Sequence, residues 1–170
     1  MQNLYRFFIH DTFEAKSADP REKAMRKVLC VCVGNQRRSP MMAALLKREL
    51  GPDFHVQSVG IGPSAYWGNP ASKHSVTCLL ERGIDIRDHS SRHIGSVILA
   101  EFTYIVCAGE AEQEEVFRRL NGNTTPIVQI ANRHGGGIPD PDEKGALEDY
   151  KKCAALIEAE MRKAAALILL

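Results

Sequence analysis

The chain has 170 residues, enough for a single domain whose apolar core needs no disulfide bonds. Its cysteines are odd in number and scattered through apolar runs, which argues against a disulfide framework and predicts reduced thiols in the cytoplasm: Cys30, Cys32, Cys78, Cys107 and Cys153. A net charge of +1 gives no sign of a nucleic-acid partner, and no apolar run is long enough for insertion into a membrane.

The first 27 residues differ in composition from the rest of the chain. Aromatic residues gather between Tyr5 and Phe13, and a mixed-charge stretch from Ala15 to Lys27 follows. We interpret residues 1–27 as an N-terminal extension and residues 28–170 as the domain. The extension is expected to pack on the domain, to contact a partner or to remain an unpacked arm.

Short apolar runs alternate with helical periods from residue 28 onward. Strands are predicted over residues 28–32, 55–61, 102–108 and 126–131. Helices are predicted over residues 40–50 with Ser39 as N-cap, from a cap at Asn69-Pro70 to Gly83, over residues 110–120 and over residues 146–169. This order predicts a doubly wound α/β fold, with a four-stranded parallel sheet and helices on both faces. Ligands of such sheets bind at the carboxyl ends of the strands, where the loop after the first strand lies.

That loop has the composition of an oxyanion-binding site. It reads VCVGNQRRSP, with five residues between Cys32 and Arg38 and a helix directly after it. A thiol attacks phosphorus only as the thiolate, and a helix N-terminus, a nest of backbone N–H groups and a guanidinium all favour negative charge here. The guanidinium of Arg38 can hold two equatorial phosphate oxygens. Gly34 and Asn35 suit backbone conformations with positive φ, and the hydroxyl of Ser39 is expected to donate to the Cys32 sulfur.

Displacing an alkoxide or a phenolate also needs a proton donor, which contributes about 10²–10⁴ in rate. Asp140 is the best candidate because it lies in Ile138-Pro139-Asp140-Pro141, where two prolines stiffen the loop after the fourth strand. An aspartate between prolines is also a common turn former, and Asp142 and Glu143 compete with it for this role.

The loop VCVGNQRRSP resembles the signature of the low-molecular-weight protein tyrosine phosphatases, and Pro139-Asp140-Pro141 resembles that family's general-acid loop. The similarity extends from residue 28 to near residue 165. It implies Cys32 as nucleophile, Arg38 as phosphate clamp and Asp140 as acid and then base, in a two-step displacement through a cysteinyl phosphate with no metal or other cofactor. The residues implied in phosphate binding and loop support are Val33, Gly34, Asn35, Gln36, Arg37, Ser39, Ser64 and His89.

This chain departs from the resembled family around the phosphate loop. Most members carry a second cysteine before the loop arginine, able to form a protective disulfide with the nucleophile, and here the residue is Arg37. We expect Arg37 to face solvent and to add positive potential. Gln36 is neither the isoleucine common in tyrosine phosphatases nor the threonine of the related arginine phosphatases. Asp142 and Glu143 stand where an aromatic residue usually flanks the substrate, and acidic residues there repel anions and attract basic peptides.

Tyr66 and Trp67 belong to a segment that lines the substrate cleft in the resembled family. With Asp142 and Glu143 they are the candidate cleft residues, and packing of the aromatic rings on the domain is the alternative. Three histidines show no metal-ligand spacing and are assigned to the surface: His74, His93 and His134.

These features predict a cytoplasmic, cysteine-dependent phosphatase that acts on phosphotyrosine in proteins or peptides and binds phosphate or sulfate in its loop. Alternatives are a protein arginine phosphatase, a non-catalytic phosphate-binding module and an arsenate reductase. The last needs a further cysteine pair, and the wide spacing of Cys78 and Cys107 argues against it. The presence of Cys32, Arg38 and Asp140 argues against a non-catalytic module.

Overall fold

The first strand of the domain is buried on both faces. The computed structural model describes residues 25–170, so most of the predicted extension at residues 1–27 lies outside the described residues. Strand β1 (Arg26–Cys32) begins two residues earlier than predicted. Its apolar residues from Val28 to Cys32 are almost fully buried, as expected of a central strand in a parallel sheet.

Strands and helices alternate along the chain as the sequence predicts. After β1 follow α1 (Arg38–Leu50), β2 (Phe54–Gly60), the 3-10 helix η2 (Pro63–Trp67), α2 (Lys73–Leu80), the 3-10 helices η3 (Ile94–Ser96) and η4 (Leu99–Glu101), β3 (Tyr104–Cys107), α3 (Glu110–Leu120), β4 (Ile127–Ile130), the 3-10 helix η5 (Arg133–Gly135) and α4 (Leu147–Ile168). Within residues 25–170, no helix has both the length and the apolar character needed to cross a membrane.

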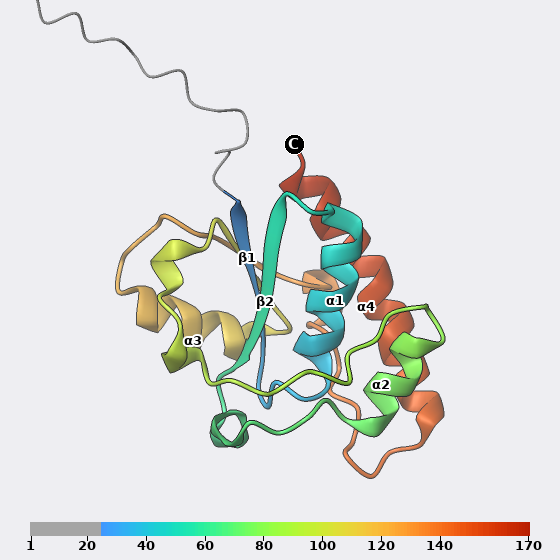
Figure 1. Ribbon diagram of the computed structural model, residues 1–170. Helices are drawn as coiled ribbons and strands as arrows, with labels where there is room; N and C mark the ends of the chain where they lie inside the picture. The colour runs from blue at the N-terminus through green and yellow to red at the C-terminus, as the bar shows by residue number, and fades with distance from the viewer. Residues whose placement is uncertain (1–24) are drawn as a thin grey trace, which may run out of the picture.

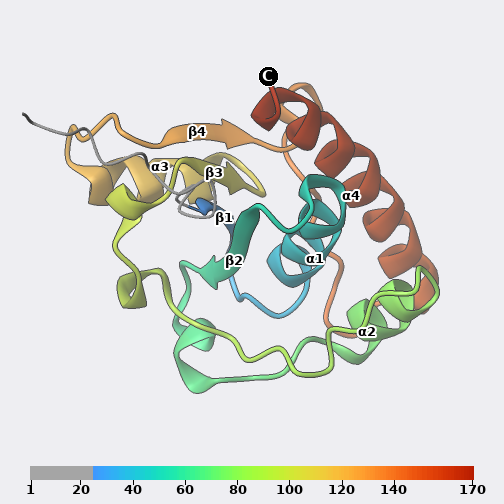
Figure 2. The ribbon, with the colours of Figure 1, turned by 45° about the horizontal axis from the view of Figure 1, so that its top comes forward.

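The four strands form one parallel sheet in the order β2-β1-β3-β4 (Figure 2). Strand β1 pairs with β2 up to the position where Cys32 lies opposite Gly60. Since β1 is flanked on both sides, Cys32 stands at the middle of the carboxyl edge of the sheet, where a doubly wound fold binds its ligands.

Helices cover both faces of the sheet (Figures 1 and 2). Helices α1 and α4 pack together on one face, over a core that includes Val28, Cys30 and Ile157. On the opposite face α3 covers a second core that includes Leu29 and Val116. Successive residues of β1 thus serve opposite cores, and the predicted four-stranded α/β fold is confirmed.

The helix starts differ from the sequence prediction at two places. Ser39 lies inside α1 and not at its N-cap, which is Arg37, because the Ser39 hydroxyl is used by the phosphate loop. Helix α2 begins after Ser72, whose Oγ accepts a hydrogen bond from the Ser75 amide. Asn69, the predicted cap, donates instead to the carbonyl of Ser64 at 3.1 Å and so ties down the preceding segment.

Candidate active site

The loop between β1 and α1 wraps around the sulfur of Cys32. Asn35 takes a left-handed conformation with φ of 54°, as the sequence suggested, and its amide donates to Cys32 Sγ at 3.3 Å. Within residues 25–170, the amides of Gly34, Gln36 and Arg37 donate no hydrogen bond to any other group. The loop therefore holds unused backbone donors of the kind that bind an oxyanion.

Asn35 fixes the shape of this loop through four hydrogen bonds. Its Nδ2 donates to the hydroxyl oxygens of Ser39 and Ser58, both at 2.9 Å, and its Oδ1 accepts from the Arg92 amide at 2.8 Å. Its carbonyl oxygen lies 2.6 Å from His89 Nε2, which fits a ring that donates from this nitrogen. Because Asn35 is fully buried, these bonds hold the loop without competition from water.

Two supporting residues differ from those implied by the sequence. Ser58 and the Arg92 backbone contact Asn35, whereas Ser64 lies on the wall of the cleft and its Oγ would meet a Cβ placed on Gly34. A signal for Ser58 did exist in the sequence. It is a polar residue near the end of a predicted strand, directly after Gln57, where the strand becomes buried. No local pattern indicated the backbone donor at Arg92.

Ser39 lies within reach of the Cys32 sulfur. The Sγ to Oγ distance is 3.0 Å, and the carbonyl of Val59 lies 3.3 Å from the same hydroxyl. A serine has one hydroxyl proton. With a thiol present, Cys32 donates to Ser39 Oγ and Ser39 donates to Val59; with a thiolate, the Ser39 proton can turn to the sulfur instead.

The guanidinium of Arg38 points toward the loop before α4 and toward α3. Its Nη1 donates to the carbonyl of Ile138, and its Nη2 donates to Asp140 Oδ2, both at 3.0 Å. Nη2 also lies 3.3 Å from Glu112 Oε1. The Nε group is buried and has no partner among the described residues, so it is one of the Arg38 donors that remain for an anion.

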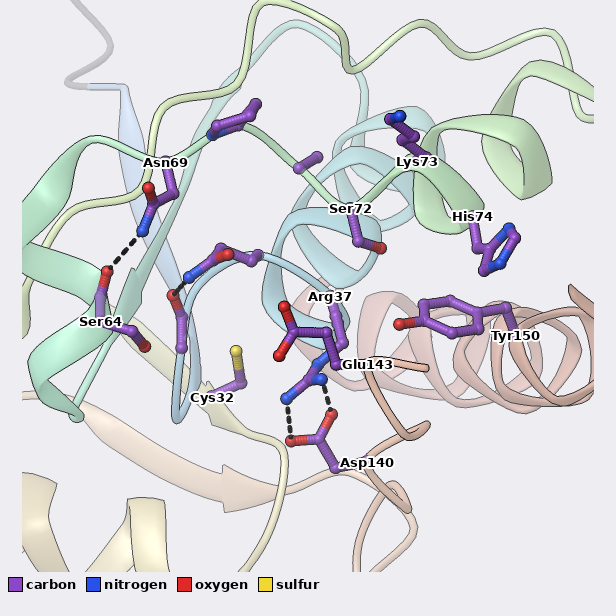
Figure 3. Close-up of a pocket in the computed structure, with 14 residues that line it drawn as sticks. Cys32, Arg37, Ser64, Asn69, Ser72, Lys73, His74, Asp140, Glu143 and Tyr150 are labelled. Carbon is purple, nitrogen blue, oxygen red and sulfur yellow. Dashed lines mark hydrogen bonds and ion pairs between the residues drawn. The ribbon is translucent and has the colours of Figure 1, made fainter. Parts of the chain in front are cut away.

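Arg37 is partly exposed, with 27% of its side chain open to solvent, but its guanidinium is paired with Asp140 and does not simply extend into solvent as the sequence predicted. Its Nε lies 3.1 Å from Asp140 Oδ1 and its Nη2 donates to Asp140 Oδ2 at 3.3 Å, as Figure 3 shows. The reason is that the loop containing Asp140 folds back over the start of α1, within reach of both arginines. Asp140 is thereby held at the edge of the cleft that contains Cys32.

Glu112 is a buried carboxylate that the sequence interpretation missed. It is 3% exposed, its Oε1 has no hydrogen bond among the described residues, and its nearest charge is that of Arg38. A signal did exist, since Glu112, Val116 and Leu120 recur at helical spacing on the buried face of α3. An acidic residue on an apolar face is normally paired with a buried cation.

The cleft beside Cys32 has a volume of about 590 Å³. It is lined by Cys32, Gly34, Gln36, Arg37, Ser64, Asn69, Pro70, Ala71, Ser72, Lys73, His74, Asp140, Glu143 and Tyr150 (Figure 3). These residues come from the phosphate loop, η2, the segment leading into α2 and its first turn, the loop before α4 and α4 itself.

Only one of the four predicted cleft residues, Glu143, lines this cleft. Tyr66 stacks on His93, with ring centroids 3.8 Å apart, and Trp67 is 77% exposed outside the cleft wall. Asp142 does not line the cleft; together with Asp140 and Asp149 it lines a neighbouring depression. Val33 is also partly exposed and does not line the cleft.

The histidines do not all lie at the surface. His93 is buried, contrary to prediction: its Nε2 lies 3.2 Å from the Ile61 carbonyl and its Nδ1 accepts from the Gly95 amide. His74 is half-buried against Tyr150, whereas His134 is exposed as predicted. In the part of the chain that the structure describes, no group of three potential metal ligands comes together.

All five cysteines are unpaired thiols. Burial raises the pKa of Cys153 to about 12 and raises the pKa values of Cys30 and Cys107 well above their usual range. These thiols are therefore protonated at neutral pH, and Cys32 is the one that lies on the wall of the cleft.

Residues 27–168 match the model of the low molecular weight phosphotyrosine protein phosphatase family. The chain belongs to this family. A probable low molecular weight protein-tyrosine-phosphatase from Ralstonia solanacearum, EpsP, is 32% identical over 79% of this chain and 90% of the relative. A protein-arginine-phosphatase from Geobacillus stearothermophilus is 30% identical over 74% of this chain and 84% of the relative.

Solved structures agree with this assignment. The YwlE arginine phosphatase from Geobacillus stearothermophilus has a TM-score of 0.71 and 27% identity, covering 85% of this chain and 93% of the other. Vibrio vulnificus Wzb in complex with benzylphosphonate has a TM-score of 0.74, covering 84% and 99%; at 24% identity this likeness shows the fold alone. The predicted family and enzyme class, a hydrolase of phosphoric monoesters, are confirmed.

Proposed function

We propose that this protein hydrolyses phosphotyrosine in proteins or peptides through a phosphoenzyme intermediate on Cys32. The observation that carries the proposal is the arrangement at one cleft: a cysteine sulfur inside a loop of unused amide donors, and an aspartate held at the edge of the same cleft by two arginines. Family membership supports phosphoric monoester hydrolysis.

In the first step the Cys32 thiolate attacks phosphorus. The bond from phosphorus to the leaving oxygen breaks, and this oxygen takes up a proton from Asp140, which acts in this step in its protonated form and not as the ion-paired carboxylate of the free site. The free amides of Gly34, Gln36 and Arg37 and the buried Nε of Arg38 are the donors for the equatorial oxygens. These donors are fixed before substrate arrives, because Asn35 holds the loop.

In the second step a water molecule attacks the phosphocysteine. Asp140, now a carboxylate, takes the proton of the water while the bond between sulfur and phosphorus breaks. The sulfur leaves as a thiolate, and the Ser39 hydroxyl, 3.0 Å away, stabilises it by turning its proton to Sγ. Inorganic phosphate is the product, and no metal or other cofactor enters either step.

We further propose that residues 28–170 form the phosphatase domain and that it works in the cytoplasm on phosphorylated proteins or peptides. Five unpaired thiols support a reducing compartment. Binding of phosphate or sulfate in the loop is supported by relatives described with benzylphosphonate and with sulphate. The net charge of +1 gives no reason to propose a nucleic-acid partner.

Phosphoarginine is the second candidate substrate. Glu143 and Gln36 line the cleft, while the aromatic rings of Tyr66 and Trp67 lie outside it. A carboxylate in the same cleft as the cysteine suits the guanidinium of phosphoarginine, although Tyr150 and His74 still give the cleft aromatic rings for phosphotyrosine. The similarity to the Geobacillus stearothermophilus protein-arginine-phosphatase supports this candidate.

Turnover of an aryl phosphate tests the proposal. We expect Cys32→Ser to lose activity, Asp140→Asn to lose about 10²–10⁴ in kcat, and the matched control Asp142→Asn to keep it, since Asp142 lies outside the cleft. Activity that survives Cys32→Ser would exclude the covalent route. Parallel assays with phosphotyrosine and phosphoarginine peptides then rank the two substrates by kcat/KM.

A further inference from the structure

Tyr150 places an unpartnered hydroxyl in the cleft. The residue is only 1% exposed, and within residues 25–170 no hydrogen bond involves its hydroxyl. Figure 3 shows this hydroxyl pointing into the cleft, toward Arg37 and Glu143. Its ring is fixed by the core around it and by His74, whose ring meets it edge-on at 5.0 Å. The ring is buried while the hydroxyl opens to the cleft without a protein partner, so the hydroxyl is available to a ligand there.

The first residues of α2 form the neighbouring wall. Ser72, Lys73 and His74 line the cleft, and among the described hydrogen bonds none is donated by the amides of Lys73 or His74. The positive end of the helix dipole and the Lys73 side chain at the rim add positive potential. The Ser72 amide donates to the Gln36 carbonyl at 2.8 Å, so this helix end is attached directly to the phosphate loop.

The opposite wall carries two carboxylates, one that is ion-paired and one that is not. Asp140 is paired with Arg37 and Arg38. Glu143 forms no ion pair in the described part of the chain, and its carboxylate lies in the cleft in Figure 3. Arg37 uses only Nε and Nη2 on Asp140, which leaves its Nη1 donors for another anion.

We propose that Tyr150, the start of α2 and Arg37 form a subsite for a second anionic group of the substrate, a carboxylate or a second phosphate. The Tyr150 hydroxyl donates to this group, the amides of Lys73 and His74 and the Lys73 ammonium attract it, and Glu143 opposes it. The phosphoryl group lies in the loop and the second anion lies toward α2. This subsite rests on the proposed function and adds selectivity for acidic phosphopeptides.

Phosphotyrosine peptides that differ in one flanking residue test the subsite. The flank is glutamate, phosphoserine, glutamine or lysine, and each variant's kcat/KM for a charged peptide is divided by its own value for the glutamine peptide. We expect the glutamate and phosphoserine peptides to be preferred about tenfold in the wild type. The two anionic arms distinguish a carboxylate from a phosphate as the favoured group.

Tyr150→Phe removes only the hydroxyl, and Lys73→Ala removes only the rim charge. Each is expected to lower the preference toward unity, and Glu143→Gln is expected to raise it. Lys47→Ala is the matched control, because Lys47 is exposed on α1 outside the cleft. A preference that Tyr150→Phe leaves unchanged, or a wild type that prefers the lysine peptide, overturns the subsite.

Binding of the same peptides to the Cys32→Ser variant separates this inference from the catalytic proposal. The ratios of Kd values can be measured without turnover. If the wild type is inactive but binding of acidic peptides still depends on Tyr150, the proposed function is wrong and the subsite stands. Equal Kd values for the glutamate, phosphoserine and glutamine peptides would overturn the subsite even in a fully active phosphatase.

Discussion

Arg37 and Arg38 share one carboxylate, that of Asp140, and their contacts decide where it lies. Arg38 holds it through Nη2, while Arg37 approaches both oxygens through Nε and Nη2. A cysteine at this position, which the family resemblance implies for most members, could not make such contacts. Arg37 therefore gives Asp140 an anchor where a thiol could instead form a disulfide with Cys32.

Removal of this anchor has a measurable consequence. Arg37→Ala frees one side of a partly exposed ion pair, so we expect kcat for aryl phosphates to fall by about fivefold. The same change in an Asp140→Asn background is expected to add no further loss, because the carboxylate that Arg37 holds is gone. Arg37→Lys keeps the charge but not the two-pronged geometry of the guanidinium, so its kcat should lie between those of the wild type and Arg37→Ala. Additive effects of the two substitutions in steady-state kinetics would show that Arg37 acts elsewhere.

The phosphate loop also depends on a close approach between elements. Gly60 ends β2 directly beside the loop, and a Cβ at this position would lie 2.5 Å from the Val33 carbonyl oxygen and 3.0 Å from the Asn35 amide. Glycine is needed here for space and not for an unusual φ. The strand end and the loop can therefore be this close only without a side chain between them.

Gly60→Ala is expected to destabilise the protein by about 1–3 kcal/mol and to weaken inhibition by inorganic phosphate, because the loop must shift. Gly122→Ala is the matched control. It strains a positive φ in the turn after α3 but meets no atom within 4 Å, so it should lower stability and leave phosphate inhibition unchanged. Thermal unfolding and phosphate inhibition measured on both variants separate the two effects, and unchanged inhibition in Gly60→Ala would contradict this account of the loop.

Local patterns predicted the elements better than their ends. The apolar run from Val28 to Cys32 predicted β1, and helical spacing predicted α1, α3 and α4. Such predictions succeed because an element that buries a whole face carries apolar residues at a regular spacing. Ser39 was misassigned as a cap since a serine before Pro40 fits a cap equally well. Its hydroxyl instead forms hydrogen bonds with Asn35 and Cys32, which are tertiary contacts that the local sequence does not reveal.

The site itself was predictable where its residues are close in sequence. Cys32, Asn35 and Arg38 lie in one loop, and Asp140 was marked by its two prolines. Tyr150 and Glu112 were not predicted. The helical spacing of Glu112 with Val116 and Leu120 marks it as buried, but no local pattern shows that α3 brings it to Arg38 or that α4 brings Tyr150 to the cleft.

Stability of the whole molecule is expected to depend on pH through His89. Burial lowers the pKa of His89 below its ordinary value of 6.5, with the hydrogen bond to Asn35 opposing this shift and Arg92 adding to it. In mildly acidic solution His89 therefore binds a proton more readily in the unfolded chain than in the folded chain. The free energy of unfolding is highest above pH 6.5, where His89 is neutral in both states, and it declines as pH falls below 6.5. The pH range in which His89 acts lies above the range in which Glu115 acts. The hydrogen bond from Arg118 lowers the pKa of Glu115 to about 2, so the stability that Glu115 contributes is lost only in more strongly acidic solution.

Melting temperatures recorded between neutral and mildly acidic pH test this dependence. We expect Tm to fall on acidification in the wild type and the His89→Gln variant to lose much of that slope, since glutamine does not titrate. An identical slope in both proteins would assign the dependence to other groups.

Chemical trapping of the phosphoenzyme tests the central claim most directly. Asp140→Asn is mixed with an aryl phosphate of good leaving group, quenched in acid, and its peptides are analysed by mass spectrometry. We predict one added phosphoryl group on the peptide that carries Cys32, because loss of the base slows hydrolysis of the intermediate more than its formation. Turnover with no phosphoryl group on Cys32 at any quench time, or with the group on another residue, would contradict the account.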